Sequence, residues 1–372
     1  MTRDAPVSAE LLASLEAQYA GVEVASALLA ALRRHLALGA LDYAEPPEPI
    51  LGGTESWIFG FRLAGAPTAW QGPLVLRVAR DDQPRLDLRF EAAVQRAVAG
   101  QGFPAPRVLA LFDADAELGR PGLVMERIPG VAGPAGLFDR ARSGPLALLL
   151  GAPRLLSRLP VLQARALLQL HALDPEPLRR ELERSEVFAR CSSLDARLAE
   201  IESDAIETGH AALRALAAWL VANRPPDTAP LSICHGDFHA FNLMFAPGRL
   251  TGVIDWTGAR LADPHLDLGV VRAQLEISQL PVARVPTRVV RAVQMGILRC
   301  FEREYARTRP IDPVRLAYYE ALPCASAVAR MLRHGKDASR EPLAELAWEH
   351  PHALARLERR VRAVTGIELS LG

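Results

Sequence analysis

Lysine is almost absent from this chain. Lys336 is the only lysine among the 43 basic residues, and all the others are arginines. A cation site upstream of Lys336 must therefore use arginine, whose forked guanidinium is permanently charged and holds phosphate oxygens with a geometry different from that of lysine. The 43 acidic residues bring the formal net charge to zero, so charge gives no support to a nucleic-acid partner.

Cysteine is also scarce. The four cysteines, Cys191, Cys234, Cys300 and Cys324, lie far apart without metal-ligand spacing. We expect them to be reduced thiols of a cytoplasmic protein, with Cys234 packed in the core at the end of an apolar run. No apolar run is long enough to span a bilayer, and the amino terminus lacks the core of a signal peptide, so we expect no membrane partner.

The 372 residues, half of them apolar, allow a large core and predict two lobes or domains. Residues 8–38 have the apolar spacing of two helices, separated at Gly21 and ended at Gly39. We expect this pair to be an extension packed on the body of the protein. The proline-rich segment 45–49 cannot be helical and is interpreted as a linker.

From Ile50 the apolar pattern changes from helices to strands. We expect strands at 57–63, 74–79, 108–112 and from 122 towards a hinge near 130, with one helix from 89 to about 100. Residues 131–153, rich in Gly, Pro and Ala, are interpreted as a loop. Further helices are expected at 155–173, within 176–224, and at 270–279, 287–308, 312–334 and 341–364.

A β-hairpin is predicted within the segment 231–267. Two short apolar runs, 243–245 and 250–254, lie on either side of Pro247-Gly248, a strong turn signal. A hairpin at this place would bring the residues before its first strand close to the residue after its second strand.

Polar side chains occupy those positions. Asp237 and Asn242 precede the first strand, and Asp255 follows the second. Such oxygen ligands suit Mg²⁺ beside phosphates, and one carboxylate remains to accept a proton. Asp and Asn are also common in turns, so the triplet His235-Gly236-Asp237 alone would favour a turn between buried strands. The complete ordered set favours a phosphoryl-transfer site.

The spacing Asp237-x-x-x-x-Asn242 is that of the catalytic loop of kinases. With His235-Gly236 before it and Ile254-Asp255-Trp256 after it, the segment resembles the aminoglycoside phosphotransferase family, the bacterial small-molecule branch of the protein-kinase-like fold. The resemblance covers residues 50–267, with further specific stretches at 125–130 and 170–175.

The resemblance implies an α+β, two-lobed protein-kinase-like fold. It implies a nucleotide-binding N-lobe at 45–128, built from a small antiparallel sheet with one helix. It implies a larger, mostly helical C-lobe at 129–372 with the catalytic loop and the acceptor-binding helices. Residues 1–44 would be an N-terminal helical extension.

The resemblance also implies that ATP lies between the lobes. The turn Gly52-Gly53-Thr54 would cover the phosphates, and the segment around Met125, Glu126 and Ile128 would contact adenine. Arg77 occupies the strand position where kinases place a phosphate-binding lysine, and Glu91 would be its ion-pair partner. Two alternatives remain open, namely that Arg77 lies on a solvated strand face and that Glu91 is a surface residue.

In the catalytic loop the resemblance implies that Asn242 and Asp255 hold Mg²⁺ and that Asp237 takes the proton of an acceptor hydroxyl. His235 would brace the loop. His239 either faces the acceptor region or is a turn residue, and Asp267 either caps the next helix or bonds to the loop. His171 is interpreted as a core histidine.

The expected function is ATP-dependent O-phosphorylation of a small hydroxylated acceptor. More Arg than Asp and Glu follows Asp267, which favours a neutral or anionic acceptor, such as a hydroxyacyl compound or another metabolite, over an aminoglycoside. The alternatives are a non-catalytic nucleotide-binding module that kept the fold, and a protein kinase. The absence of H-R-D, D-F-G and A-P-E segments weighs against the protein kinase. The sequence leaves the oligomeric state open.

Overall fold

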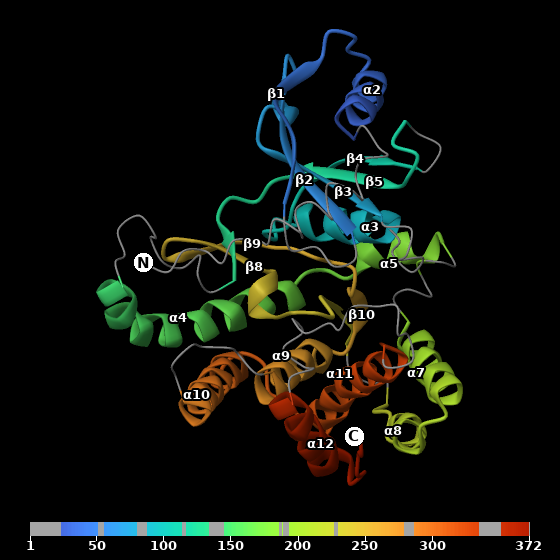
Figure 1. Cartoon of the computed structure of the whole chain (residues 1–372), viewed down its shortest axis with the longest axis vertical. Coiled ribbons are helices and arrows are strands. Elements are labelled where there is room, and N and C mark those ends of the chain that lie inside the picture. Colours follow the sequence, from blue (N-terminus) through green and yellow to red (C-terminus); the bar gives the residue numbers. More distant parts are fainter. Residues whose placement is uncertain are drawn as a thin grey trace. The chain divides into compact units, whose positions relative to one another are not determined.

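The computed structural model describes residues 24–50, 56–79, 88–113, 117–133, 145–185, 188, 193–226, 230–278, 286–334 and 351–371. By its internal contacts the chain divides into two compact units. Unit 1 takes Met1–Arg96 and Pro106–Ile128, and unit 2 takes Ala97–Ala105 and Pro129–Gly372. Figure 1 labels the helices and strands of both units.

Unit 1 is built on a five-stranded antiparallel sheet with the order β1-β2-β3-β5-β4. Phe59, Phe61 and Leu63 alternate along one strand and are all buried, which gives the sheet one apolar face. Its elements are α2 (Val24–Leu36), β1 (Asp42–Pro49), β2 (Ser56–Ala64), the short helix η1 (Thr68–Trp70), β3 (Leu74–Ala79), α3 (Leu88–Ala99), β4 (Val108–Phe112) and β5 (Gly122–Glu126).

The linker predicted at 45–49 is wrong, because these residues form most of β1. β1 lies at the edge of the sheet and pairs only with β2, so its prolines need not donate to a second neighbour. The register shifts between Tyr43 and Glu45 and again between Glu45 and Glu48, and the second shift spans the prolines Pro46 and Pro47.

Helix α2 ends three residues before Gly39, the residue predicted to end it. Ala37 adopts the left-handed φ of 53° instead, and its N–H donates to the Arg34 carbonyl at 3.2 Å. A non-glycine residue in this conformation carries no sequence signal, so the end of the helix was misplaced. The first of the two expected N-terminal helices lies outside the described residues.

Unit 2 is mostly helical. Its helices are α4 (Pro145–His171), α5 (Glu176–Glu183), α7 (Leu194–Thr208), α8 (Ala211–Ala222), α9 (His265–Ile277), α10 (Thr287–Ala306), α11 (Pro313–His334) and α12 (Pro351–Thr365). Its short strands are β6 (Val131–Ala132), β7 (Ser232–Cys234), β8 (Leu243–Ala246), β9 (Arg249–Val253) and β10 (Arg260–Ala262), and η3 (Ala240–Asn242) is a single 3₁₀ turn.

The loop predicted at 131–153 is wrong at both of its ends. β6 pairs with β8 at the start, and α4 already begins at Pro145, where an apolar run continues its helical pattern. Residues 134–144 lie outside the described part of the chain. The same holds for the start of the helix expected at 341, and α12 begins at Pro351.

Helices α9 and α11 lie side by side at the centre of unit 2 (Figure 1). Gly269 makes this close approach possible, because a Cβ at this position would lie 2.3 Å from the Tyr319 carbonyl oxygen. Tyr318, Leu322 and Ala325 of α11 are buried in the same core cluster. The start of α9 is thereby fixed directly after the segment that carries the polar residues of interest.

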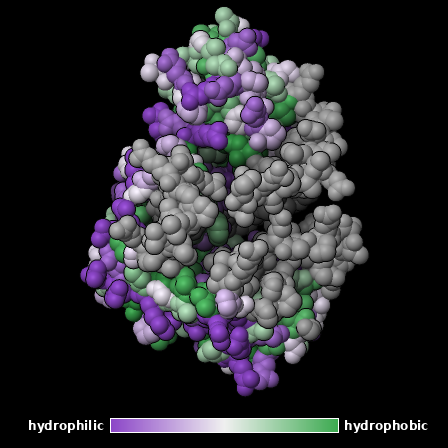
Figure 2. Space-filling view, turned by 60° about the vertical axis from the view of Figure 1, so that its left-hand side comes forward, coloured by the Kyte–Doolittle hydropathy of each residue, from purple (hydrophilic) through white to green (hydrophobic). Residues whose placement is uncertain are grey.

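Among the described helices, none has the length and apolar character needed to cross a bilayer. On the face seen in Figure 2, hydrophilic side chains are interspersed with small separate hydrophobic patches.

Candidate active site

The predicted hairpin is present as β8 and β9. The two strands are antiparallel, with Leu243 opposite Val253. The Ile254 N–H donates to the Asn242 carbonyl at 2.9 Å, which extends the pairing by one step beyond the strands. Asp255 follows directly, so Asn242 and Asp255 lie at the same end of the ribbon.

Asp237 lies beside Asn242 in the loop before this ribbon. The Asn242 amide Nδ2 donates to the Asp237 carbonyl at 3.0 Å and to its carboxylate Oδ2 at 3.2 Å. Because the amide is planar, Oδ1 of Asn242 then points away from Asp237. The Asp237 side chain is 46 % exposed, whereas Asn242 is buried. The carboxylate is therefore held from one side and open to solvent on another.

His239 contacts the same carboxylate. Its Nε2 lies 3.3 Å from Oδ2 of Asp237, and its Nδ1 accepts from the Phe241 N–H at 3.2 Å. Burial opposes the charge of Asp237, but hydrogen bonds and charge from His239, His235 and Asn242 outweigh it and lower the pKa of Asp237. Burial likewise opposes protonation of His239, but Asp237 outweighs it and raises the pKa of His239.

His235 is fully buried under this loop. Its Nε2–H donates to the Ile254 carbonyl at 3.0 Å, and its Nδ1 accepts from the Asp237 N–H at 3.3 Å. The ring packs on Trp256 with centroids 4.6 Å apart. Burial lowers the pKa of His235 although three carboxylates lie nearby. A neutral ring with one donor and one acceptor braces the loop, as expected.

Asp267 holds the loop from α9. Its Oδ2 accepts from the His235 N–H at 2.9 Å, and its Oδ1 accepts from the Gly236 N–H at 2.7 Å. Of the two contacts predicted for Asp267, the structure therefore has the bond to the loop. Gly236 is required here, because it has a φ of 78° and a Cβ would lie 1.9 Å from the Gly258 carbonyl oxygen.

A buried hydrogen-bond chain continues behind Asp267. His171 donates from Nε2 to Asp267 at 3.0 Å and accepts at Nδ1 from the Tyr305 hydroxyl at 2.8 Å. Cys234 lies close to this pair, and its thiol faces the carbonyls of Ala262 and Asp263. Burial raises the pKa of Cys234, so it stays a thiol. Asp267, His171 and Tyr305 form a core network in which both imidazole nitrogens have partners. His171 and Cys234 are both buried, as predicted.

Asp255 has an unusual backbone. Its φ is +66°, in the left-handed region that non-glycine residues rarely adopt. Its Oδ1 accepts from the Thr257 hydroxyl at 3.0 Å. Backbone strain of this kind is often found at functional sites. Nothing in the sequence pattern marked Thr257.

In unit 1 the predicted ion pair between Arg77 and Glu91 is present. The Arg77 NH1 donates to Glu91 Oε1 at 2.7 Å, and its Nε donates to the Ser56 hydroxyl at 2.6 Å. Arg77 and Glu91 are 7 % and 1 % exposed, so the alternatives of a solvated Arg77 and a surface Glu91 are wrong. Gln95, one helical turn after Glu91, donates to the same carboxylate at 3.0 Å. Sequence reasoning missed Ser56 and Gln95, although the i, i+4 spacing marks Gln95 as a neighbour of Glu91.

The segment expected to contact adenine lies at the end of β5. Met125 is buried, and the Glu126 N–H donates to the Arg107 carbonyl at 2.9 Å. A contact of Glu126 with a base must therefore use its carbonyl oxygen, and Ile128 follows two residues later. The turn Gly52-Gly53-Thr54 lies outside the described residues.

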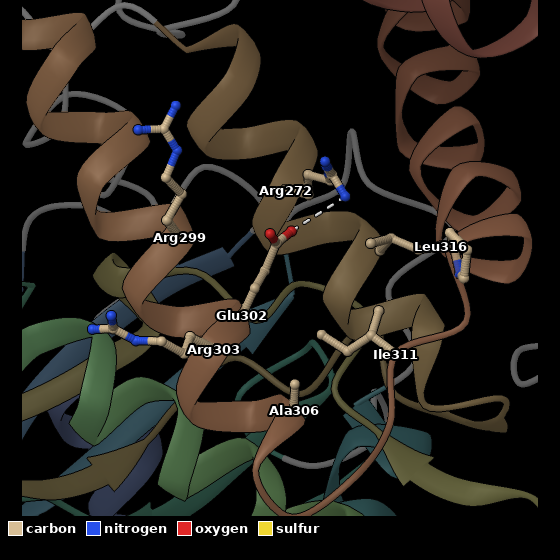
Figure 3. A pocket seen from close by; sticks show the side chains of 8 residues that line it. Arg272, Arg299, Glu302, Arg303, Ala306, Ile311 and Leu316 are labelled. Carbon is tan, nitrogen blue, oxygen red and sulfur yellow. Dashed lines mark ion pairs between the residues drawn. The ribbon is translucent and has the colours of Figure 1, made fainter.

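A cavity of about 370 Å³ opens elsewhere in unit 2, between α9, α10 and the start of α11 (Figure 3). Arg272 and Glu302 point towards one another across it, 3.3 Å apart. Its other lining side chains are Arg299, Arg303, Ala306, Ile311, Pro313 and Leu316. None of the residues predicted for phosphoryl transfer lines this cavity.

Comparison with known proteins places the geometry in context. The profile of the phosphotransferase enzyme family matches residues 66–311. An aminoglycoside 3'-phosphotransferase of Streptomyces fradiae is 28 % identical over 231 residues, which is 61 % of this chain and 80 % of the relative. Acyl-CoA dehydrogenase family member 11 of Gallus gallus is 30 % identical over 201 residues, which is 53 % of this chain and only 23 % of that longer protein.

Solved structures share the fold at low identity. The ethanolamine kinase of Plasmodium vivax superposes with a TM-score of 0.58 at 11 % identity, covering 98 % of this chain and 97 % of that chain. The aminoglycoside phosphotransferase APH(4)-Ia, in a ternary complex with AMP-PNP and hygromycin B, gives 0.52 at 18 % identity, covering 90 % and 98 %. The predicted kinase-like α+β fold, with a small antiparallel sheet and a larger helical part, is thereby confirmed.

Proposed function

Because the chain belongs to the phosphotransferase enzyme family, we propose that it is an ATP-dependent kinase that phosphorylates the hydroxyl of a small molecule. One observation carries the proposal. Asp237, Asn242 and Asp255 gather at one end of the β8–β9 ribbon, with Asn242 bonded to Asp237 and paired through its backbone with the residue before Asp255.

Asp237 is the proposed base. Its lowered pKa keeps it ionised at neutral pH, and its exposed carboxylate is accessible to an acceptor hydroxyl. The acceptor oxygen forms a bond to the γ-phosphorus while the bond from phosphorus to the bridging oxygen of ADP breaks. The hydroxyl proton passes to Asp237 late in this step, so positioning contributes more than basicity.

Asn242 and Asp255 are the proposed Mg²⁺ ligands. An amide oxygen directed away from Asp237 and a carboxylate at the same end of the ribbon are the hard oxygen donors that Mg²⁺ prefers. Bound there, the ion would neutralise charge on the phosphates. Thr257 orients the Asp255 carboxylate through a 3.0 Å hydrogen bond.

We assign the nucleotide contacts to unit 1. Arg77 would bind phosphate oxygens while Glu91 and Ser56 hold its side chain in place. The backbone from Glu126 to Ile128 would bond to adenine, with Met125 near the base. ATP as the donor rests on fold analogy with APH(4)-Ia, which was solved with AMP-PNP.

The names of the similar proteins include kinases of an aminoglycoside and of ethanolamine, so the family relationship leaves the acceptor open. A hydroxylated metabolite remains as good a candidate as an antibiotic. A non-catalytic nucleotide-binding module is the second candidate, but such a module has no use for an exposed carboxylate held beside two metal ligands.

An ADP-release screen tests the proposal. Purified protein with ATP and Mg²⁺ is mixed with alcohols, acyl thioesters, aminoglycosides and macrolides in turn. We expect release with at least one class and a loss of at least a hundredfold in Asp237→Asn, whose melting temperature should stay close to that of the parent. ATP-dependent stabilisation without release from any acceptor would favour the non-catalytic module.

A further inference from the structure

Phe241 exposes its ring next to the proposed base. The side chain is 56 % exposed, although it lies in η3 directly before the buried Asn242. An exposed aromatic ring beside a proposed base offers apolar surface that a bound acceptor could cover with a gain in free energy.

The loop fixes the position of this ring. His239 accepts the Phe241 N–H at 3.2 Å, and its own ring lies 6.2 Å from the Phe241 ring, centroid to centroid. The other nitrogen of His239 lies 3.3 Å from the Asp237 carboxylate. The imidazole of His239 therefore contacts both the proposed base and the exposed ring.

Gly133, the residue directly after β6, supports the other side of the ring. A Cβ on Gly133 would lie 2.9 Å from the Phe241 ring, so the missing side chain at Gly133 makes room for it. Val131, in β6 just before Gly133, is 44 % exposed and adds a second apolar side chain in this neighbourhood. The ring therefore has a support on one side and stays accessible on another.

The charge balance of the residues after Asp267 disfavours a polycationic ligand. Residues 268–372 contain 16 arginines and one lysine against 11 acidic residues. An excess of carboxylates favours a polycationic ligand, and these residues have the opposite balance of charge.

We propose that Phe241 is a specificity-determining residue that packs against the apolar carbon surface of a neutral alcohol, while the hydroxyl of that alcohol faces Asp237. This inference rests on the proposed function and names the acceptor class for the same site. The reaction is unchanged: the alcohol oxygen binds the γ-phosphoryl group, its proton goes to Asp237, and ADP leaves.

The test compares acceptors that differ in charge and apolar surface. Aliphatic and alicyclic alcohols of increasing carbon number, neutral sugars and polyamine-bearing aminocyclitols are assayed for ADP release with the parent, Phe241→Ala and Phe241→Leu. Ile206→Ala on α7 is the matched control, because Ile206 is equally apolar and 77 % exposed.

We expect kcat/KM to rise with carbon number for the neutral alcohols. Phe241→Ala should raise KM for these acceptors about tenfold with a smaller change in kcat, and Phe241→Leu should recover part of the loss. The KM for ATP should be the same in all variants, and Ile206→Ala should match the parent throughout.

Two outcomes overturn the inference while the proposed function survives. One is Asp237-dependent release with aminocyclitols and none with neutral alcohols. The other is equal KM values for parent and Phe241→Ala with the best neutral alcohol, which would assign the ring to packing within the protein. Absence of Asp237-dependent release with every acceptor would instead reject the proposed function itself.

Discussion

Nε2 of His239 lies 3.3 Å from Oδ2 of Asp237, and this contact shifts the pKa values of the two groups in opposite directions. The pKa of Asp237 is lowered against the effect of burial, and the pKa of His239 is raised against the same effect. The Asp237 carboxylate therefore stays ionised at a pH where an ordinary aspartate begins to protonate.

His239→Ala should move the acid limb of the kcat/KM profile to higher pH, because Asp237 loses the neighbour that favours its charged form. The same contact also adds to the free energy of unfolding. The contribution of Asp237 is complete above the ordinary pKa of an aspartate and is lost as the pH falls through the lowered pKa of Asp237. The contribution of His239 to the free energy of unfolding is complete below its ordinary pKa of 6.5, and it is lost as the pH rises through the raised pKa of His239 in the folded protein. Initial rates between pH 4 and 9 measure the shift. Replacement of His210, at the start of α8, is the control, and an acid limb that stays in place in His239→Ala would contradict the assignment.

Gly236→Ala should destabilise the protein by at least about 3 kcal/mol and abolish activity. The φ of 78° costs an alanine about 1–2 kcal/mol, and the Cβ would in addition lie 1.9 Å from the Gly258 carbonyl oxygen. Gly248→Ala is a matched control, since its φ is 77° but its Cβ would meet nothing closer than 3.6 Å. Urea unfolding of both variants separates the two costs, and equal midpoints would show that the loop relaxes around the new side chain.

Arg77→Met should cost about 3–5 kcal/mol of unfolding free energy, because it leaves the Glu91 carboxylate buried without its cation. The double variant Arg77→Met/Glu91→Leu should recover most of this loss. Arg62→Met removes a pair with Glu45 whose side chains are 40 % and 68 % exposed, and it should cost less than about 1 kcal/mol. Denaturant titration of the four proteins gives the comparison. A double variant that is no more stable than Arg77→Met would mean that Arg77 acts mainly through Ser56.

Tyr305→Phe should cost about 1–2 kcal/mol, because it removes the hydroxyl that donates to Nδ1 of the buried His171. Tyr43→Phe removes a 2.7 Å bond to the Ala25 carbonyl in a more exposed place and should cost less. Thermal unfolding of both variants checks the order. The reverse order would show that His171 finds a replacement partner.

The sequence was most informative where the decisive contacts are local. The β8–β9 hairpin follows from two apolar runs around Pro247-Gly248, and it alone determines that Asn242 and Asp255 share one end of a ribbon. The Arg77–Glu91 pair was also accessible, because a lone cation in an apolar strand and an acid in the next helix have few other ways to be satisfied.

Contacts between segments that are far apart in the chain could not be predicted from local sequence patterns. Tyr305 follows His171 by 134 residues, and neither has a spacing that points to the other. The edge strand β1 was missed because proline normally argues against a strand, and its tolerance at an edge depends on a neighbour that the local sequence does not reveal. For Asp267 the sequence allows either a cap on the next helix or a bond to the catalytic loop, because it does not show which way the side chain points from α9.

At position 255 the backbone and the proposed chemistry favour different residues. The left-handed φ favours glycine, whereas the proposed cation site needs a carboxylate. Glycine is the residue that would relax the chain there, yet it has no side-chain oxygen for the proposed cation. Selection for thermal stability alone would therefore favour Asp255→Gly. Under the proposed function this variant should be inactive, so activity has to be screened together with stability.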